Sequence, residues 1–168
     1  MITKRQFLDS CLNEIQIIKH LYGKVTPEML SYRPSEKQRS MLELLQYLSH
    51  FAKVEAAAVY TGKAVDFKTA MITAYQMPAE DFLPMMDEQA EELKNIFSKI
   101  TDTELKAEVN LFGTDNSQPR TIWFFNLILK SLTAYKMQLF LYLKACRVAE
   151  IGTSNLWRGE DNRRLNQT

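Results

Sequence analysis

Four stretches of about 20 to 30 residues, each with an apolar stripe at helical spacing, constrain the fold of this chain most strongly. They run from about 3 to 22, 40 to 60, 80 to 100 and 119 to 147. Gly23 and Gly62 follow the first two stretches, and Ser40 with Glu43 forms a capping box at the start of the second. Connectors of roughly 15 to 20 residues separate the stretches. The pattern predicts an all-α four-helix bundle with long connecting loops.

The composition suits one globular domain without a strongly charged partner. The chain has 168 residues and a formal charge of +1, so no basic excess favours nucleic acid or acidic lipid. Its first residues, MITKRQFLDS, lack the apolar core of a signal peptide, and no apolar run approaches the length of a membrane span. We therefore expect a cytoplasmic protein, with a bundle over 1–150 and a tail, 151–168, that packs on the bundle or trails from it.

Two shorter patterns extend this interpretation. The third stretch carries one apolar stripe for burial and places Pro84 in its first turn, where a missing N–H costs little. The stripe consists of Phe82, Met86, Ala90, Leu93, Phe97 and Ile100. After it, VNLFG at 109–113 indicates a short extended segment.

The inward face of the fourth stretch carries polar groups. At about 100° per residue, the side shared with Phe124 and Ile128 also holds Ser131, Tyr135, Gln138, Tyr142 and Cys146. The opposite, solvent-facing side holds Asn126, Lys130, Thr133, Lys136, Lys144 and Arg147. An unpaired buried polar group costs about 1–3 kcal/mol. The inward groups therefore imply either a hydrogen-bonded core network or a cavity that holds water or a ligand.

The second stretch places a carboxylate among apolar residues. Glu55 falls in the middle of the apolar stripe and Tyr47 at its border, while Gln46, His50 and Lys53 lie on the polar side. A carboxylate that faces a core must be paired, hydrogen-bonded or neutralised by a raised pKa. We expect Tyr135 or Tyr142 to donate to it. The candidate cavity residues are Tyr47, Glu55, Ser131, Tyr135, Gln138, Tyr142 and Trp123.

The sequence carries no familiar metal or nucleophile motif. HxxxH, HExxH, GxSxG and a glycine-rich phosphate loop are all absent. The two histidines, His20 and His50, fall on the polar sides of different helices. Catalytic zinc sites commonly use three protein ligands. Two histidines on different helices cannot supply a three-histidine site, which argues against a metalloenzyme.

Three segments resemble the DinB-like (YfiT-like, metal-dependent hydrolase) superfamily. They are YKMQLFLYLK at 135–144, RSMLELLQYLSHFAKVE at 39–55 and SNLWRGED at 154–161. The resemblance implies an up-down-down-up four-helix bundle with a site at its open end. It also implies a divalent metal, Zn or Ni, held by one histidine of the second helix and an HxxxH pair of the last. Members include metal-dependent thiol transferases and a thiol-dependent isomerase, and relatives often form dimers.

Carried over by position, the family's last-helix histidines fall on Ser131 and Tyr135. The helix-two ligand falls on Tyr47 when counted seven residues from Ser40, and on His50 when counted five residues back from Glu55. We prefer Tyr47, because His50 projects to the polar side. Neutral Ser and Tyr are poor ligands for Zn or Ni compared with imidazole. We therefore predict no cofactor, with His50 as a weak metal candidate.

Three functions follow from this interpretation. The first is a metal-free DinB-like bundle that binds a small molecule in the former metal cavity, with Trp123 near its mouth. The second is a homodimeric interaction module, with Phe125, Leu129 and Leu132 facing a second copy. The third is a metal-dependent transferase or hydrolase with an unusual ligand set. Residual catalysis without metal would use Tyr135 or Glu55 as acid or base, although no activated nucleophile is evident.

Overall fold

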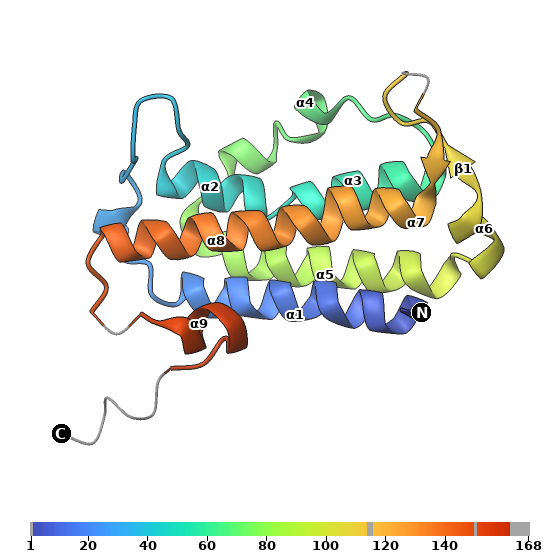
Figure 1. Ribbon diagram of the computed structural model, residues 1–168. Helices are drawn as coiled ribbons and strands as arrows, with labels where there is room; N and C mark the ends of the chain where they lie inside the picture. The colour runs from blue at the N-terminus through green and yellow to red at the C-terminus, as the bar shows by residue number, and fades with distance from the viewer. Residues whose placement is uncertain (1, 114–115, 150, 162–168) are drawn as a thin grey trace.

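The computed structural model describes residues 2–113, 116–149 and 151–161. Four long helical rods lie side by side in it (Figure 1). They are α1 (Lys4–Tyr22), α2 with α3 (Met41–Leu48 and Phe51–Thr61), α5 (Phe82–Lys99), and α7, η4 and α8 (Arg120–Trp123, Phe124–Leu129 and Lys130–Ala145). The first and last rods run in one direction and the two middle rods in the other (Figure 1). This arrangement confirms the predicted all-α, up-down-down-up bundle.

Short elements occupy the connections. Between the parallel rods α3 and α5 the chain returns along the outside of the bundle (Figure 1). The short elements are η1 (Pro27–Met29), α4 (Phe67–Ala70), η2 (Ala74–Gln76), η3 (Ala79–Asp81), α6 (Asp102–Lys106), β1 (Glu108–Val109), β2 (Gln118–Pro119) and α9 (Thr153–Arg158). The strands β1 and β2 pair antiparallel, so the extended segment expected at 109–113 is limited to its first residue.

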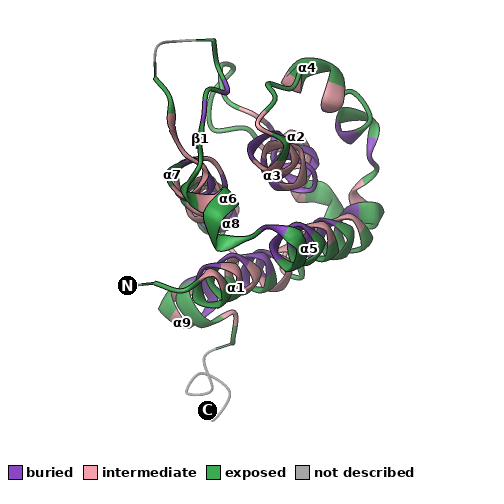
Figure 2. Cartoon of the chain, turned by 90° about the vertical axis from the view of Figure 1, so that its right-hand side faces the viewer, coloured by how far each residue is buried: buried purple, intermediate pink, exposed green. Residues whose placement is uncertain are grey.

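The four rods enclose one apolar core. Viewed end-on, the buried parts of the helices face one another (Figure 2). Every member of the apolar stripe predicted on α5 is buried, because α5 is an unbroken α-helix whose spacing follows the 100° projection. The capping box of Ser40 and Glu43 is also present, with the Glu43 N–H donating to the Ser40 hydroxyl at 3.2 Å.

The second rod is broken, although the sequence predicted one continuous helix. The helix α2 ends at Leu48 and α3 begins at Phe51. Gln89, a fully buried residue of α5, reaches into the break. Its carbonyl oxygen accepts from the N–H groups of Ala52 at 2.9 Å and Lys53 at 3.2 Å, and its amide donates to the Leu48 carbonyl at 3.1 Å. These bonds satisfy backbone groups that the break releases.

Two residues of the predicted polar side are buried in the structure. His50 is only 6% exposed, so its predicted place on the solvent side is wrong. Its Nδ1 lies 2.7 Å from the Ser49 hydroxyl. Gln46 precedes the break and is buried for another reason: the connection that includes η2 packs over α2, and Gln46 donates to the Met77 carbonyl at 3.0 Å. Since the backbone leaves the helical path at Ser49 and His50, a projection that assumes a straight helix misplaces His50.

The fourth rod contains a π-helical segment, Phe124–Leu129. A π turn holds an extra residue, so every later residue is rotated relative to an ideal α-helix. The fully buried positions after the turn are accordingly Leu132, Lys136, Leu139 and Leu143, each one residue beyond the predicted inward set. Lys136, predicted to face solvent, is 1% exposed. Leu132, predicted to face a second copy, lies in the core.

The C-terminal tail is described as far as residue 161, and 162–168 of the expected tail lie outside the described residues. The helix α9 packs against α1. The Asn155 amide nitrogen lies 3.0 Å from His20 Nε2, and Lys24 pairs with Asp161 at 2.6 Å. His20 is therefore a half-buried contact to the tail rather than an open surface residue.

Candidate functional site

Two tyrosines from different rods meet beside the core. Tyr47 lies in the last turn of α2 and Tyr135 in the second turn of α8, with their ring centroids 4.7 Å apart. Phe51 stacks on Tyr47 at 5.2 Å with an interplanar angle of 7°. The π turn rotates α8 so that Lys136 lies in the core. Tyr135, the preceding residue, is thereby turned toward α2 and α3. We call Tyr47, Phe51 and Tyr135 the aromatic cluster.

The environment of the aromatic cluster keeps the Tyr47 phenol neutral. Burial raises the pKa of Tyr47 well above its usual range, and Tyr135, through its charge and a hydrogen bond, raises it further. The charge of Glu55 adds to this increase, and only Arg39 opposes it. The Arg39 guanidinium lies 4.1 Å from the centroid of the Tyr47 ring, a cation–π contact.

Two predicted site residues hold Arg39 in this place. The Tyr142 hydroxyl donates to the backbone carbonyl of Arg39 at 2.9 Å. Gln138 donates to the Tyr142 oxygen at 2.6 Å, and Tyr32 packs edge-on against the Tyr142 ring. Tyr142 and Gln138 thus fasten the connector before α2 to α8. Their part in the site is to position Arg39 above the aromatic cluster.

Glu55 contributes a carboxyl group with a raised pKa. It lies on α3, close enough for its charge to raise the pKa of Tyr47. Its Oε2 atom is buried and has no hydrogen-bond partner among the described residues. Burial raises the pKa of the Glu55 carboxyl to about 7. The Tyr142 hydroxyl, expected as a donor, is used by Arg39 instead. Near neutral pH this carboxyl can therefore accept or donate a proton.

The two remaining predicted residues lie differently. Ser131 is half-buried one turn before Tyr135, on the same side of α8. Trp123 lies three turns before Tyr135, at the end of the bundle, where its indole N–H donates to the Val109 carbonyl at 3.0 Å. Phe112 packs edge-on against Trp123. Trp123 therefore fastens the loop after β1 and does not join the aromatic cluster.

The side chains in and around the aromatic cluster differ in exposure. Tyr47 is 8% exposed, whereas Ser131, Tyr135 and Glu55 are half-buried. Phe67 of α4, in the returning connection, covers part of the cluster with its ring 6.0 Å from that of Tyr47. The ring contacts fill the interior of the site, so access for another molecule is from the half-buried edge.

The residues at the family's metal positions do not fit a Zn or Ni ion. Tyr47, Ser131 and Tyr135 offer neutral oxygens, and the raised pKa of Tyr47 opposes formation of a phenolate ligand. The His50 ring contacts the Ser49 hydroxyl, and its pKa is lowered by burial and by the charge of Lys53, with Glu88 opposing this change. Across the described ranges, no three His, Cys, Asp or Glu side chains gather as a potential metal group.

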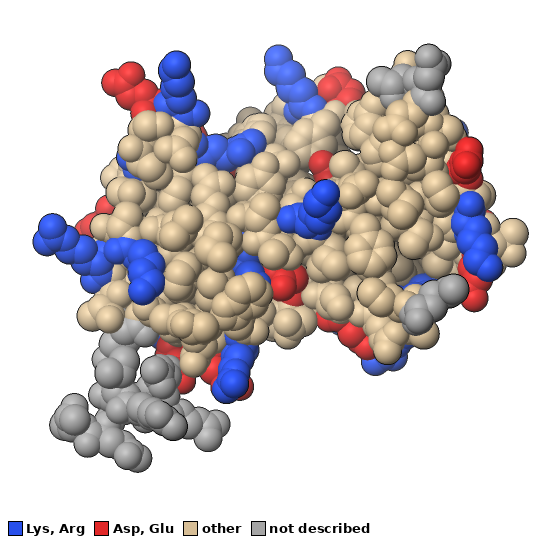
Figure 3. Space-filling model, in the orientation of Figure 1, with Lys and Arg blue, Asp and Glu red and all other residues tan. Residues whose placement is uncertain are grey.

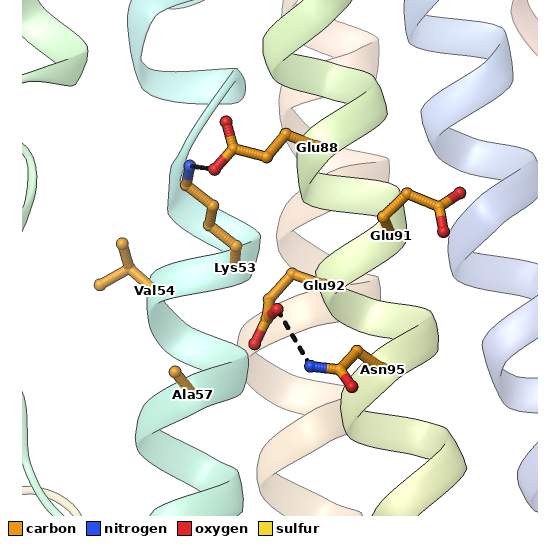
Figure 4. Close-up of a pocket in the computed structure, with 7 residues that line it drawn as sticks. All are labelled: Lys53, Val54, Ala57, Glu88, Glu91, Glu92 and Asn95. Carbon is orange, nitrogen blue, oxygen red and sulfur yellow. Dashed lines mark hydrogen bonds and ion pairs between the residues drawn. The ribbon is translucent and has the colours of Figure 1, made fainter.

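A separate groove lies between α3 and α5. It has a volume of about 590 Å³ and includes Lys53, Glu88, Glu91 and Glu92. Figure 4 shows Lys53 reaching across to Glu88, with their charged atoms 2.7 Å apart. The groove is shallow and its acidic side chains lie along one helix. It includes none of the predicted site residues.

The fold is DinB-like. The chain superposes on the crystal structure of a DinB-like protein, YjoA, from Bacillus subtilis with a TM-score of 0.68. The two chains are 19% identical, and the match covers 88% of this chain and 95% of that chain. No model of a protein family and no curated protein matches the sequence. In the parts of the chain that the structure describes, no helix is long and apolar enough to cross a membrane.

Two contributors to the site were absent from the predicted set. Phe51 follows Tyr47 by four residues, a spacing that places the two side chains together on the continuous helix predicted from the sequence, and this signal was available although the break lies between them. Arg39 directly precedes the capping Ser40, but its position above Tyr47 depends on Tyr142, which lies 103 residues away in sequence. No local pattern in the sequence reveals such a contact.

Proposed function

We propose that this chain binds a small, neutral aromatic molecule at the half-buried edge of the aromatic cluster, without a metal held by Tyr47, Ser131 or Tyr135. The buried Glu55 Oε2 atom, which has no hydrogen-bond partner in the described parts of the chain, carries this proposal. A buried polar atom in this state gains a hydrogen bond when a ligand supplies a donor. The carboxyl, with its pKa of about 7, suits a neutral N–H or O–H group better than a charged one.

The surroundings favour an aromatic ligand. Tyr135 and Phe67 are half-buried and present ring surface at the edge of the site. The Arg39 guanidinium lies 4.1 Å from the centroid of the Tyr47 ring and 5.8 Å from that of Tyr135, so the Tyr135 ring is the less closely covered of the two. Ligand sites commonly combine such apolar walls with a few converging polar groups.

Benzamide is a suitable first probe, because it is neutral, planar and carries an N–H donor. We expect millimolar benzamide to shift backbone ¹H–¹⁵N signals near Glu55 and Tyr135. Tyr135→Leu, which removes the stacking ring, and Glu55→Leu should each weaken the interaction several-fold while the spectrum stays folded. Tyr60→Leu, on a half-buried tyrosine of α3 outside the aromatic cluster, is the matched control and should bind as the parent chain does.

Two results would contradict the proposal. Shifts confined to other surfaces, or equal weakening by the Tyr60 control, would remove the site from the aromatic cluster. Zinc or nickel retained at one equivalent by untagged protein, and lost on Tyr47→Phe or Tyr135→Phe, would show that these oxygens do hold a metal.

A second proposed function is self-association through the outer side of the last rod. Leu141 is 55% exposed there and Ile122 43%. The surface over this rod is largely uncharged in Figure 3. Met137 is half-buried on the same side of α8 as Leu141, one turn away. Two copies that pack these surfaces together would remove apolar area from water.

Sedimentation velocity tests this second proposal directly. We expect the parent chain to sediment as a dimer at micromolar concentration and Leu141→Glu as a monomer. Leu83→Glu changes another exposed leucine, which is 37% exposed on α5, and should leave the dimer intact. A parent chain that stays monomeric at high concentration would rule out this function.

A further inference from the structure

A second pocket opens at the end of the bundle where α1 begins. It has a volume of about 690 Å³ and lies between the start of α1, the end of α5, the short helix α6 and the start of the last rod. Figure 2 looks onto this end of the molecule. Small-molecule sites commonly measure about 300–1,000 Å³. The pocket is roughly 15 Å along the last rod from Tyr135, so it is separate from the aromatic cluster.

Four phenylalanines form the floor of the end pocket. Phe7 stacks on Phe97 at 5.5 Å and meets Phe125 edge-on at 4.7 Å, while Phe97 and Phe124 lie 4.9 Å apart. Phe7, Phe97 and Phe124 are buried, and Phe125 is half-buried. Leu105 of α6 adds a further apolar wall. An apolar ligand group bound on this floor would leave water for a surface of aromatic rings.

The rim of the end pocket is basic. Lys4, Arg5 and Lys106 line it, against the single carboxylate of Asp102. Arg5 already pairs with Asp9 at 2.8 Å, so its charge is compensated. Lys4 and Lys106 then face Asp102, which leaves one positive charge in excess. This balance favours a ligand with a single negative charge.

The two lysines retain donors for such a ligand. Lys4 donates to the Ile100 carbonyl at 2.8 Å, which uses one of its three ammonium protons. Lys106 is exposed in the last turn of α6. Both lie beside the phenylalanine floor, so one molecule can place an apolar body on the floor and a carboxylate at the rim.

The backbone at the pocket is also unusual. Phe124 and Phe125 are the first two residues of the π segment. Such segments interrupt α-helices frequently at functional sites. Two of the four phenylalanines of the pocket floor thus belong to the π segment of the last rod.

We propose that the end pocket binds an amphiphilic monocarboxylate, with its alkyl chain or aryl ring on the phenylalanine floor and its carboxylate at Lys106 and Lys4. This binding does not depend on the aromatic cluster. Octanoate is the test ligand, and 1-octanol is its matched uncharged control.

A titration followed by ¹H–¹⁵N NMR tests this assignment. Octanoate should shift signals around Phe7, Phe97 and Lys106 and should bind more tightly than octanol. Lys106→Gln should weaken octanoate about three- to fivefold, the effect of losing one exposed ion pair, and leave octanol unchanged. Phe125→Ala should weaken both ligands. Lys63→Gln, an exposed lysine outside the pocket, is the control variant.

Three outcomes would overturn the inference. Equal affinity for octanol and octanoate would show that the carboxylate does not contribute to binding. Unchanged octanoate binding in both Lys106→Gln and Phe125→Ala would place the ligand elsewhere. If the chain forms a dimer that dissociates on dilution, and octanoate does not bind to the dimer, a second copy of the chain covers the pocket.

Discussion

Tyr135 and Lys136 are neighbours in sequence, yet they face two different environments. Tyr135 is half-buried and meets Tyr47 of α2, beside a carboxyl oxygen of Glu55 that has no partner among the described residues. Lys136 is 1% exposed, and its Nζ lies 2.8 Å from the carboxylate of Glu14 on α1. One side of α8 is therefore closed by a compensated charge pair, and the adjacent side is left with an uncompensated polar group.

The comparison distinguishes polar groups that stabilise the fold from polar groups that can bind a ligand. A buried ion pair must be compensated within the fold, because an isolated charge in the core is very unfavourable. A neutral or protonatable group at a half-exposed edge can remain without a partner at a smaller cost. The side that faces α2 and α3 is therefore where we place ligand binding, and the side that faces α1 is where we expect the larger loss of stability on mutation.

The largest predicted effect is that of Lys136→Met. It removes one member of the buried pair and leaves the Glu14 carboxylate, whose side chain is 14% exposed, without its cation. We expect a loss of about 3–5 kcal/mol in the free energy of unfolding. Urea denaturation measures it, and adding Glu14→Leu should recover much of the loss. A loss below about 1 kcal/mol would show that the side of α8 that faces α1 is no more important for stability than the side that faces α2 and α3.

A smaller, pH-dependent effect is predicted for Glu55. Burial raises the pKa of its carboxyl from an ordinary value of 4.5 to about 7, so the folded state holds this proton more tightly than the unfolded state. The resulting stabilisation is fully present below about pH 4.5 and is lost as the pH rises through about 7. The change amounts to about 3 kcal/mol at most.

Glu55→Gln isolates this contribution. The variant cannot ionise at this position, so its stability relative to the parent chain should increase between pH 4.5 and pH 7 and stay constant above. Urea denaturation at a series of pH values measures the difference. A difference that is the same at pH 4 and pH 8 would show that the Glu55 carboxyl ionises normally.

The smallest predicted effect is that of Tyr142→Phe, which removes the hydroxyl that joins Gln138 to the Arg39 carbonyl. We expect a loss of about 2 kcal/mol, because the variant loses two hydrogen bonds worth about 1 kcal/mol each. The Arg39 side chain should also leave the Tyr47 ring. The upfield shift that the ring gives to the Arg39 side-chain NMR signals should therefore diminish. Tyr22→Phe removes another hydroxyl that donates to a backbone carbonyl, and should spare that shift.

The sequence predicts most of this fold because most helices are regular. The stripe on α5 was predicted correctly from 100° spacing. On α8 the same method placed Tyr135 on the inward face, whereas the structure leaves it half-buried. It failed for Lys136, because one π turn rotates all that follows. It failed for His50, because the break in the second rod is stabilised by Gln89 from another helix. Both errors arise from backbone departures that depend on tertiary partners.

The contact between α1 and α8 also bears on how the chain folds. It joins the first rod to the last, through Glu14 and Lys136, so it cannot form until nearly the whole chain is available. Contacts between residues so distant in sequence are slow to form. During synthesis the first three rods would leave the ribosome with their α8-facing sides uncovered, and exposed apolar surface of this kind promotes aggregation. The last rod thus completes the bundle, and a chain truncated before it should depend on chaperones to stay in solution.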